Sequence, residues 1–168
     1  RAFVSSGPLL EMQIGDALPG DTVQLPAAGG TVTVTGRLRS VTDLSEVLLV
    51  CNGQTVENFP LRRNRNSLDI SYDLAVSNSG WCHLRTEGEP GDRFPFDVAY
   101  TQALTNPVWL QVGDEVVRNR QAAEYGIAWI DKLEQLADAW PGWRSEREKA
   151  HVFGQFEQAR QVYRQNLP

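Results

Sequence analysis

The segment EVLLVCNGQTVENF, residues 46–59, sets the architecture that we expect of this chain. Its first half, Glu46 to Cys51, is apolar on both faces, which is typical of a central β-strand. Asn52-Gly53 follows, and an Asn-Gly pair between two such runs indicates a hairpin, because a type I′ turn needs φ > 0 at both positions. This segment therefore predicts an antiparallel sheet.

Strand patterns continue on both sides of this hairpin. Further strands are expected at Gly30–Ser40, Leu68–Ala75, Trp81–Thr86 and Val108–Val112, the last forming a hairpin with Glu115–Val117 over Gly113-Asp114. Turn signals separate these short strands, whereas no helical pattern does, which disfavours a parallel α/β sheet. We therefore predict an immunoglobulin-like antiparallel β-sandwich over residues 1–118.

The last third of the chain, residues 119–168, changes to a helical period. Asn119 is expected to cap a first helix, Pro141-Gly142 to end it, and Ser145 with Glu148 to form the capping box of a second. The fold class is thus mostly β plus α, with a two-helix hairpin after the sandwich.

Both helices carry an apolar stripe. In the first helix the stripe consists of Ala122, Tyr125, Trp129, Ile130, Leu133, Leu136 and Trp140; in the second, of Val152, Phe153, Phe156, Ala159 and Tyr163. Since neither helix is stable alone in water, we expect the stripes to be buried against each other, the sandwich or a missing upstream domain. A groove for a partner is the alternative, and it requires that the stripe be exposed.

Composition argues against several classes of function. The 168 residues carry a net charge of -5, whereas a nucleic-acid partner needs a basic face. We interpret the one basic cluster, Arg62-Arg63-Asn64-Arg65, as a solvated loop. No apolar run approaches the ~20 residues that span a bilayer. With two histidines, His83 and His151, and no metal-binding motif, we expect no cofactor in this chain.

The two cysteines, Cys51 and Cys82, each lie in an apolar run. They are interpreted either as reduced, buried thiols or as a disulfide between strands of two packed sheets. The second alternative would imply an oxidising compartment. The sequence leaves both open, because a disulfide needs Cα atoms within ~7 Å of each other.

The strand Trp81–Thr86 supplies the most suggestive surface. Alternation places Trp81, His83 and Arg85 on one face, where they could hold a carboxylate or a sugar, or lie beneath a covering domain. The first residues of the chain form another strand that runs into the Gly7-Pro8 turn and could lie at the same junction. The candidate domain-junction or ligand surface therefore comprises Arg1, Phe3, Ser5, Ser6, Trp81, His83 and Arg85; no residue is predicted to be catalytic.

The chain begins at Arg1 rather than Met, and it begins inside a strand pattern. A native N-terminus more often starts with a frayed polar tail, so we expect an upstream segment to have been removed. The absence of a signal peptide then says nothing about the compartment.

Several segments, in order, resemble the region after the catalytic domain in the CehA/McbA (carbaryl-hydrolase-like) type of PHP, or polymerase and histidinol phosphatase, metallohydrolases. These segments are Arg1–Leu10, Gly20–Val23, Leu44–Gly53, Ser79–Arg85, Thr105–Val112, Ala128–Leu133 and Ala159–Tyr163. The resemblance implies a hydrolase domain upstream, with its divalent metal bound there. Leu104 stands where that family has a histidine, and the family's metal ligands are absent from this sequence.

Two functions follow as hypotheses. The chain is either a non-catalytic accessory module that packs on a PHP-type hydrolase domain of the same polypeptide, or a stand-alone immunoglobulin-like module that binds a carbohydrate or another ligand. Self-association is left open by both.

Overall fold

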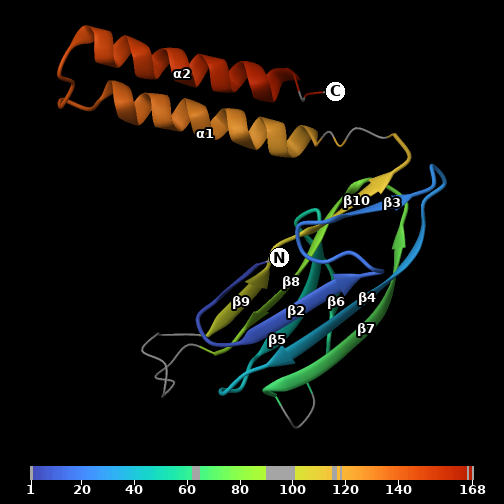
Figure 1. The fold of residues 1–168 in the computed structure, drawn as a ribbon. Helices are drawn as coiled ribbons and strands as arrows, with labels where there is room; N and C mark the ends of the chain where they lie inside the picture. The colour runs from blue at the N-terminus through green and yellow to red at the C-terminus, as the bar shows by residue number, and fades with distance from the viewer. Residues whose placement is uncertain are drawn as a thin grey trace. The chain divides into compact units, whose positions relative to one another are not determined.

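The computed structural model describes residues 2–61, 65–89, 101–114, 117, 119–165 and 167. The chain divides into two compact units, Arg1–Val116 and Val117–Pro168. The first is built from β-strands and the second from two helices (Figure 1). The strands are β1 (Phe3–Ser5), β2 (Leu9–Ile14), β3 (Thr22–Leu25), β4 (Gly30–Arg39), β5 (Glu46–Cys51), β6 (Gln54–Asn58), β7 (Ser67–Val76), β8 (Gly80–Glu87), β9 (Gln102–Thr105) and β10 (Val108–Val112); the helices are α1 (Arg120–Asp138) and α2 (Glu146–Gln165).

The strands form two sheets that pack face to face, which confirms the predicted β-sandwich. One sheet has the order β2-β4-β7. In the other, β5 lies between β6 and β8, and β8 pairs on its far side with β9 and β10. Side chains from both sheets build a single core, including Leu38 of β4, Leu49 of β5 and Leu84 of β8, all of them fully buried. The alternation of the sequence thus marks the inward faces correctly.

The hairpin at the centre of the prediction is confirmed. Asn52 and Gly53 have φ values of 51° and 80°, as a type I′ turn requires. β5 has a strand on each side, as expected of a central strand, and the successive residues Val47, Leu48 and Leu49 are all buried, so side chains on both of its faces are covered. The Asn52 side chain also accepts a hydrogen bond from the Trp81 backbone N–H at 3.0 Å, and so ties the turn to β8.

Two details of the predicted sandwich are wrong. The chain crosses between sheets after β2, and β3 then runs parallel to β10, so the fold is not antiparallel throughout. β10 lies between β8 and β3, which leaves no free edge for a hairpin partner. Of that expected partner strand, Val117 lies in no strand, and residues 115–116 fall outside the described part of the chain.

Cys51 and Cys82 form a disulfide with a Cα–Cα distance of 4.1 Å. The interpretation as reduced thiols is therefore wrong. The alternative is right about the bond but wrong about its place, because both cysteines lie in one sheet. β5 and β8 are neighbours whose register sets Cys51 opposite Cys82, and residues directly opposite in an antiparallel pair have their Cβ atoms close together.

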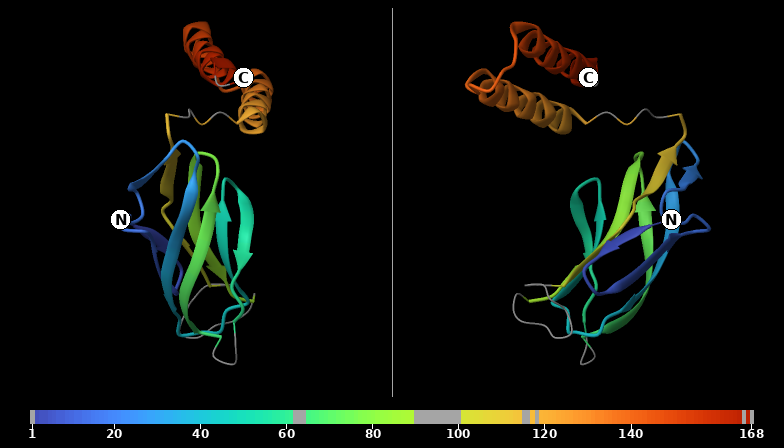
Figure 2. Two further views of the ribbon diagram at one scale, coloured as in Figure 1. Left: turned by 90° about the vertical axis from the view of Figure 1, so that its right-hand side faces the viewer. Right: turned by 60° about the vertical axis from the view of Figure 1, so that its left-hand side comes forward.

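Both helices begin at the predicted caps, and α1 ends at Asp138, ahead of Pro141-Gly142, but the Glu148 carboxylate accepts from the Arg144 N–H at 2.8 Å, one residue before the predicted capping box. The Asn119 side chain accepts a hydrogen bond from the Ala122 N–H at 3.0 Å, and the Ser145 hydroxyl accepts one from the Glu148 N–H at 3.1 Å. The two helices lie side by side and run in opposite directions (Figure 2). Gly126 allows their close approach, since a Cβ at this position would lie 2.5 Å from the Tyr163 ring.

The expected burial of the α1 stripe against α2 is met only at Ile130. Ile130 is buried, but the other six stripe residues are exposed: Ala122, Tyr125, Trp129, Leu133, Leu136 and Trp140. The stripe of α2 is more buried than that of α1, since Phe153 and Phe156 are half-buried and pack edge-on against each other. A helical period predicts that α1 has an apolar face, but it does not say what covers that face.

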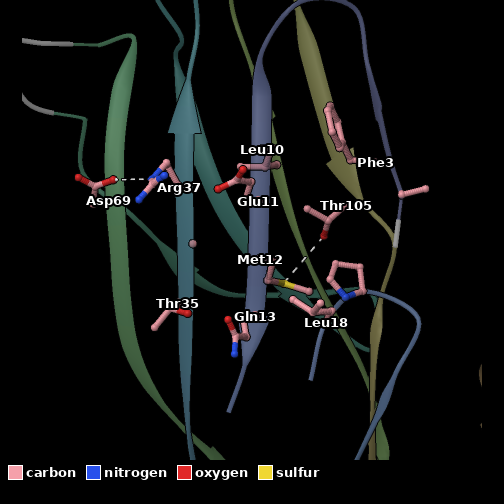
Figure 3. A pocket seen from close by; sticks show the side chains of 13 residues that line it. Phe3, Leu10, Glu11, Met12, Gln13, Leu18, Thr35, Arg37, Asp69 and Thr105 are labelled. Carbon is pink, nitrogen blue, oxygen red and sulfur yellow. Dashed lines mark hydrogen bonds and ion pairs between the residues drawn. The ribbon is translucent and has the colours of Figure 1, made fainter. Parts of the chain in front are cut away.

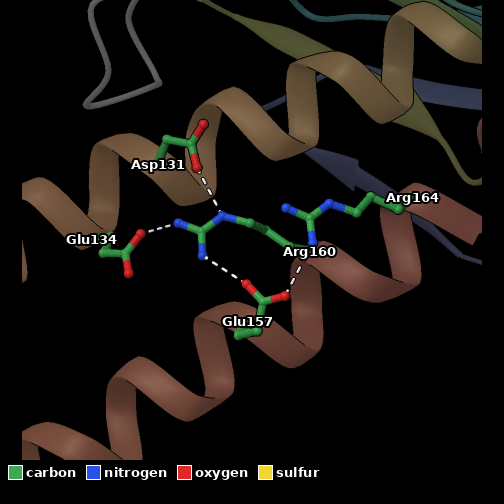
Figure 4. A network of polar contacts seen from close by, with 5 residues as sticks. All are labelled: Asp131, Glu134, Glu157, Arg160 and Arg164. Atoms are coloured by element: carbon green, nitrogen blue, oxygen red, sulfur yellow. Dashed lines mark hydrogen bonds and ion pairs between the residues drawn. The ribbon is translucent and has the colours of Figure 1, made fainter.

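Arg160 of α2 is the main polar link between the helices (Figure 4). Its side chain is 11% exposed and donates to Asp131 at 2.8 Å, to Glu134, and to Glu157 of its own helix at 3.2 Å. The hydrogen bonds, that to Asp131 foremost, raise the pKa of Arg160 above its ordinary value. The guanidinium therefore stays charged and neutralises acidic groups of both helices.

Replacing Arg160 by Met should lower the melting temperature of the helices, because Asp131 and Glu134 would be left facing α2 without a counter-charge. Circular dichroism at the helical wavelength measures this in the full chain. Arg164→Met is the matched control, since Arg164 is 54% exposed and pairs with Glu157. Equal melting temperatures for the two variants would contradict a central role for Arg160.

Candidate functional site

The candidate site is the outward face of β8 together with its neighbours β9 and β1. Trp81, His83 and Arg85 point to this side, as predicted, because Cys82, Leu84 and Thr86 between them are fully buried. Val4 of β1 lies opposite Leu104 of β9, and Leu104 lies opposite Arg85. We call this set the β8 face: Val4, Trp81, His83, Arg85 and Leu104.

The β8 face is hollowed. A depression of about 640 Å³ is lined by residues of β1, β5, β6, β8 and β9, and its lining includes the whole β8 face. Val4 is 71% exposed and Leu104 38% exposed, so the apolar side of the depression is open to solvent. Val4 and Leu104 are not among the site residues predicted from the sequence. The sequence does contain a signal for Val4, because strand alternation places its side chain on the opposite face of β1 from Phe3 and Ser5.

His83 is held as a neutral imidazole. Burial, and next the positive charge of Arg85, lower the pKa of His83 below its ordinary value of 6.5. Its ring lies 5.3 Å from the Trp81 ring, between centroids. The Nε2 atom is buried and has no hydrogen-bond partner among the described residues. His83 thus places a polar atom without a hydrogen-bond partner among the described residues beside the Trp81 ring.

Arg85 supplies the positive charge of the site. Its guanidinium donates to Glu87 at 2.6 Å, and this hydrogen bond is the main reason that the pKa of Arg85 is raised. The side chain remains 48% exposed. A guanidinium carries five N–H donors, so an approaching carboxylate can still be bound beside Glu87.

The residues predicted from the N-terminal strand contribute less to this site than those of β8. Ser5 and Ser6 both line the depression. The Ser5 hydroxyl donates to the Pro8 carbonyl, and the Ser6 hydroxyl accepts from the Gln102 N–H. Both hydroxyls therefore serve to fix the turn and the edge of the sheet. Phe3 lies opposite Thr105 on the other side of β1, away from the β8 face. Arg1 falls outside the described residues.

Phe3 instead lines a second hollow, of about 540 Å³, along β2 (Figure 3). Leu10, Met12 and Thr105 at its base are almost fully buried. The Thr105 hydroxyl accepts from the Leu84 N–H at 3.1 Å and contacts the Met12 sulfur at 3.9 Å. The Thr105 hydroxyl at its base is thus already engaged, within its own sheet and through Met12 with the other sheet, which favours the β8 face as the functional surface.

The state of His83 makes stability depend on pH. A base whose pKa is lowered by folding takes up its proton first in the unfolded chain, so the free energy of unfolding should fall as the pH drops through 6.5 and below. We expect His83→Gln to lose less stability than the wild type between about pH 7.5 and about pH 5, as measured by urea unfolding.

His151→Gln is the matched control for this experiment, because His151 lies exposed on α2. It should lose as much stability on acidification as the wild type. If His83→Gln and the wild type lose the same amount, burial of a neutral imidazole at this position is contradicted.

Within the described ranges, no three His, Cys, Asp or Glu side chains lie close enough together to hold a metal ion. Neither described helix has the length and apolarity needed to cross a membrane. Comparisons with protein-family models, with curated proteins and with solved structures found no match to this chain.

Proposed function

We propose that the unit Arg1–Val116 is a non-catalytic accessory module that docks on another folded domain through the β8 face. The observation that carries this proposal is the row Val4–Leu104–Arg85, which runs across three adjacent strands. It combines exposed apolar side chains with a cation, a combination that suits a protein interface better than open solvent. The partner that we propose is an upstream PHP-type metal-dependent hydrolase domain of the same polypeptide, and its divalent metal would be bound there.

The strand order supports an immunoglobulin-like type of sandwich. The sheet β2-β4-β7 would correspond to strands A, B and E of that fold. In the other sheet β6, β5 and β8 would correspond to C′, C and F, with β9 and β10 together in the place of G. The bridge between Cys51 and Cys82 joins strands C and F of one sheet, unlike the inter-sheet disulfide of antibody domains. Because disulfides persist in oxidising surroundings, we further propose that the module works in such a compartment.

A docking experiment tests this proposal. The reading frame upstream of the Arg1 codon should encode a domain with His-x-His and further His and Asp ligands. That domain, added to this chain, should slow amide hydrogen exchange in β1, β8 and β9. An upstream region without such ligands, or unchanged exchange in these strands, would overturn the proposal.

Two leucines provide matched variants for the docking experiment. Leu104→Asp places a charge in the β8 face and should abolish the protection. Leu9→Asp places the same charge on β2, where Leu9 is 59% exposed on the other sheet, and should leave the protection intact. Equal behaviour of the two variants would contradict the β8 face as the docking surface.

A second candidate function rests on the contact between Trp81 and His83. An aromatic ring beside a neutral imidazole, with Arg85 on the same strand, could bind a sugar or a small carboxylate in the depression. In this case Trp81 fluorescence should respond to millimolar ligand, and the response should be lost in Arg85→Met. No response to a panel of neutral and acidic sugars would remove this candidate.

A further inference from the structure

One face of α1 is apolar and exposed. Five large side chains lie along it, and we call them the α1 stripe: Tyr125, Trp129, Leu133, Leu136 and Trp140. Their exposed fractions are 66%, 49%, 44%, 61% and 57%. Exposed aromatic and aliphatic side chains gathered on one helix face are uncommon on isolated proteins and mark interaction sites.

The α1 stripe is separate from the contact between α1 and α2. That contact uses Ala123 and Ile130, which are buried, and Gly126, which lies against the Tyr163 ring. Asp131 and Glu134 also point to α2, where Arg160 binds them. Within the unit Val117–Pro168, α2 thus covers one side of α1 and leaves the α1 stripe uncovered.

The acidic residues of α1 do not oppose association of the stripe. Each of the four acidic residues of α1 is in an ion pair: Glu124 with Arg120, Asp131 and Glu134 with Arg160, and Asp138 with Lys149. The side chains between the stripe residues are mainly small or neutral, such as Ala128, Gln135 and Ala139. The negative charge of the whole chain is thus locally compensated here.

The spacing of the stripe fits a second copy of itself. Trp129 follows Tyr125 by four residues, and Trp140 follows Leu136 by four. When one helix is turned end for end against another, Tyr125 therefore meets Trp140, Trp129 meets Leu136, and Leu133 lies beside the two-fold axis. We propose that the chain forms a homodimer through antiparallel pairing of two α1 helices, which with α2 makes a four-helix bundle.

The area is sufficient for such a dimer. At their exposed fractions, five side chains of this size offer roughly 600 Å² per copy, or about 1,200 Å² for the pair, which reaches the lower end of stable interfaces. Aromatic contacts hold part of the surface in place, since Tyr125 packs edge-on against Trp129 with centroids 6.3 Å apart. Lys132 lies at the middle of the stripe, where two copies would bring like charges together, so the pairing should be limited in strength by this residue.

The mass of the full 168-residue chain in solution tests the proposal. Sedimentation equilibrium should give twice the 18.8 kDa of the single chain. Trp129→Lys should weaken the dimer by at least ~100-fold, since it removes a central aromatic and adds a charge. Lys132→Leu should tighten it. Gln161→Lys, an exposed position on α2, is the control and should leave the mass unchanged.

The direction of pairing is tested separately. Spin labels on Tyr125→Cys in one copy and Trp140→Cys in the other should lie close together, whereas two labels at position 125 should lie far apart. Circular dichroism must show unchanged helix content in each variant. A single-chain mass for the wild type, or a dimer that survives Trp129→Lys, would overturn the proposal; the first outcome would assign the stripe to a partner other than a second copy.

Discussion

Reduction of the Cys51–Cys82 disulfide is expected to lower the free energy of unfolding of the sandwich by about 3–4 kcal/mol. The bond joins cysteines 31 positions apart in the sequence, and the loop that it closes contains β6 and β7. Opening it restores conformational freedom to the unfolded chain, and this entropy is the main source of the loss. Urea unfolding of the oxidised and the reduced protein, followed by tryptophan fluorescence, measures the difference.

The double variant Cys51→Ala/Cys82→Ala separates the bond from other effects of the reductant. It should be about as unstable as the reduced protein, and it should not respond to reductant at all. Cys82 is fully buried, so the two forms will differ somewhat in packing. Coincident unfolding curves for the oxidised and reduced wild type would contradict the prediction.

The same disulfide illustrates what the sequence could and could not predict. The strands of Cys51 and Cys82 were visible, because apolar runs and an Asn-Gly turn are local signals. Their register was not visible, since it depends on which strands become neighbours. The parallel pairing of β3 with β10 escaped prediction for the same reason, as the crossing of the chain between sheets leaves no local signal.

The candidate site was predicted in part. Alternation was sufficient to place Trp81, His83 and Arg85 on one side of β8, because a single strand fixes that relation. The apolar half of the β8 face joins Val4 and Leu104, which lie a hundred residues apart in the sequence and meet through pairing of β1 with β9. The α1 stripe shows the opposite limit: its helical period was recognised, but periodicity alone does not distinguish a buried face from an exposed one.

The second large effect is expected at Leu84, in the middle of the sandwich. Leu84 is fully buried on β8, opposite Leu49 of β5. Its Cδ1 atom also extends to the other sheet, where it would lie 2.7 Å from a Cβ at Gly36 of β4. Leu84 thus fills the space that Gly36 leaves open. Leu84→Ala should cost about 2–5 kcal/mol in the free energy of unfolding, because it leaves a cavity between the sheets.

Leu9→Ala is the matched control for Leu84→Ala, since Leu9 is largely exposed; it should change the free energy of unfolding by no more than ~0.5 kcal/mol. Comparable losses at positions 9 and 84 would contradict the central place of Leu84 in the core. Urea unfolding of both variants at neutral pH provides the comparison.

The close contact between Leu84 and Gly36 leads to a further prediction, which does not follow from the burial of Leu84 alone. Gly36→Ala should itself cost about 1–3 kcal/mol, since the new methyl group would press on Leu84 and on the Glu11 carbonyl oxygen, 2.9 Å away. In the double variant the pressure on Leu84 disappears, but that on the backbone of Glu11 remains, so relief should be partial. The double variant should therefore lose roughly 1 kcal/mol less than the two single losses together. Strict additivity would show that the two residues do not share this space, and that the sheets can separate to accept the methyl group.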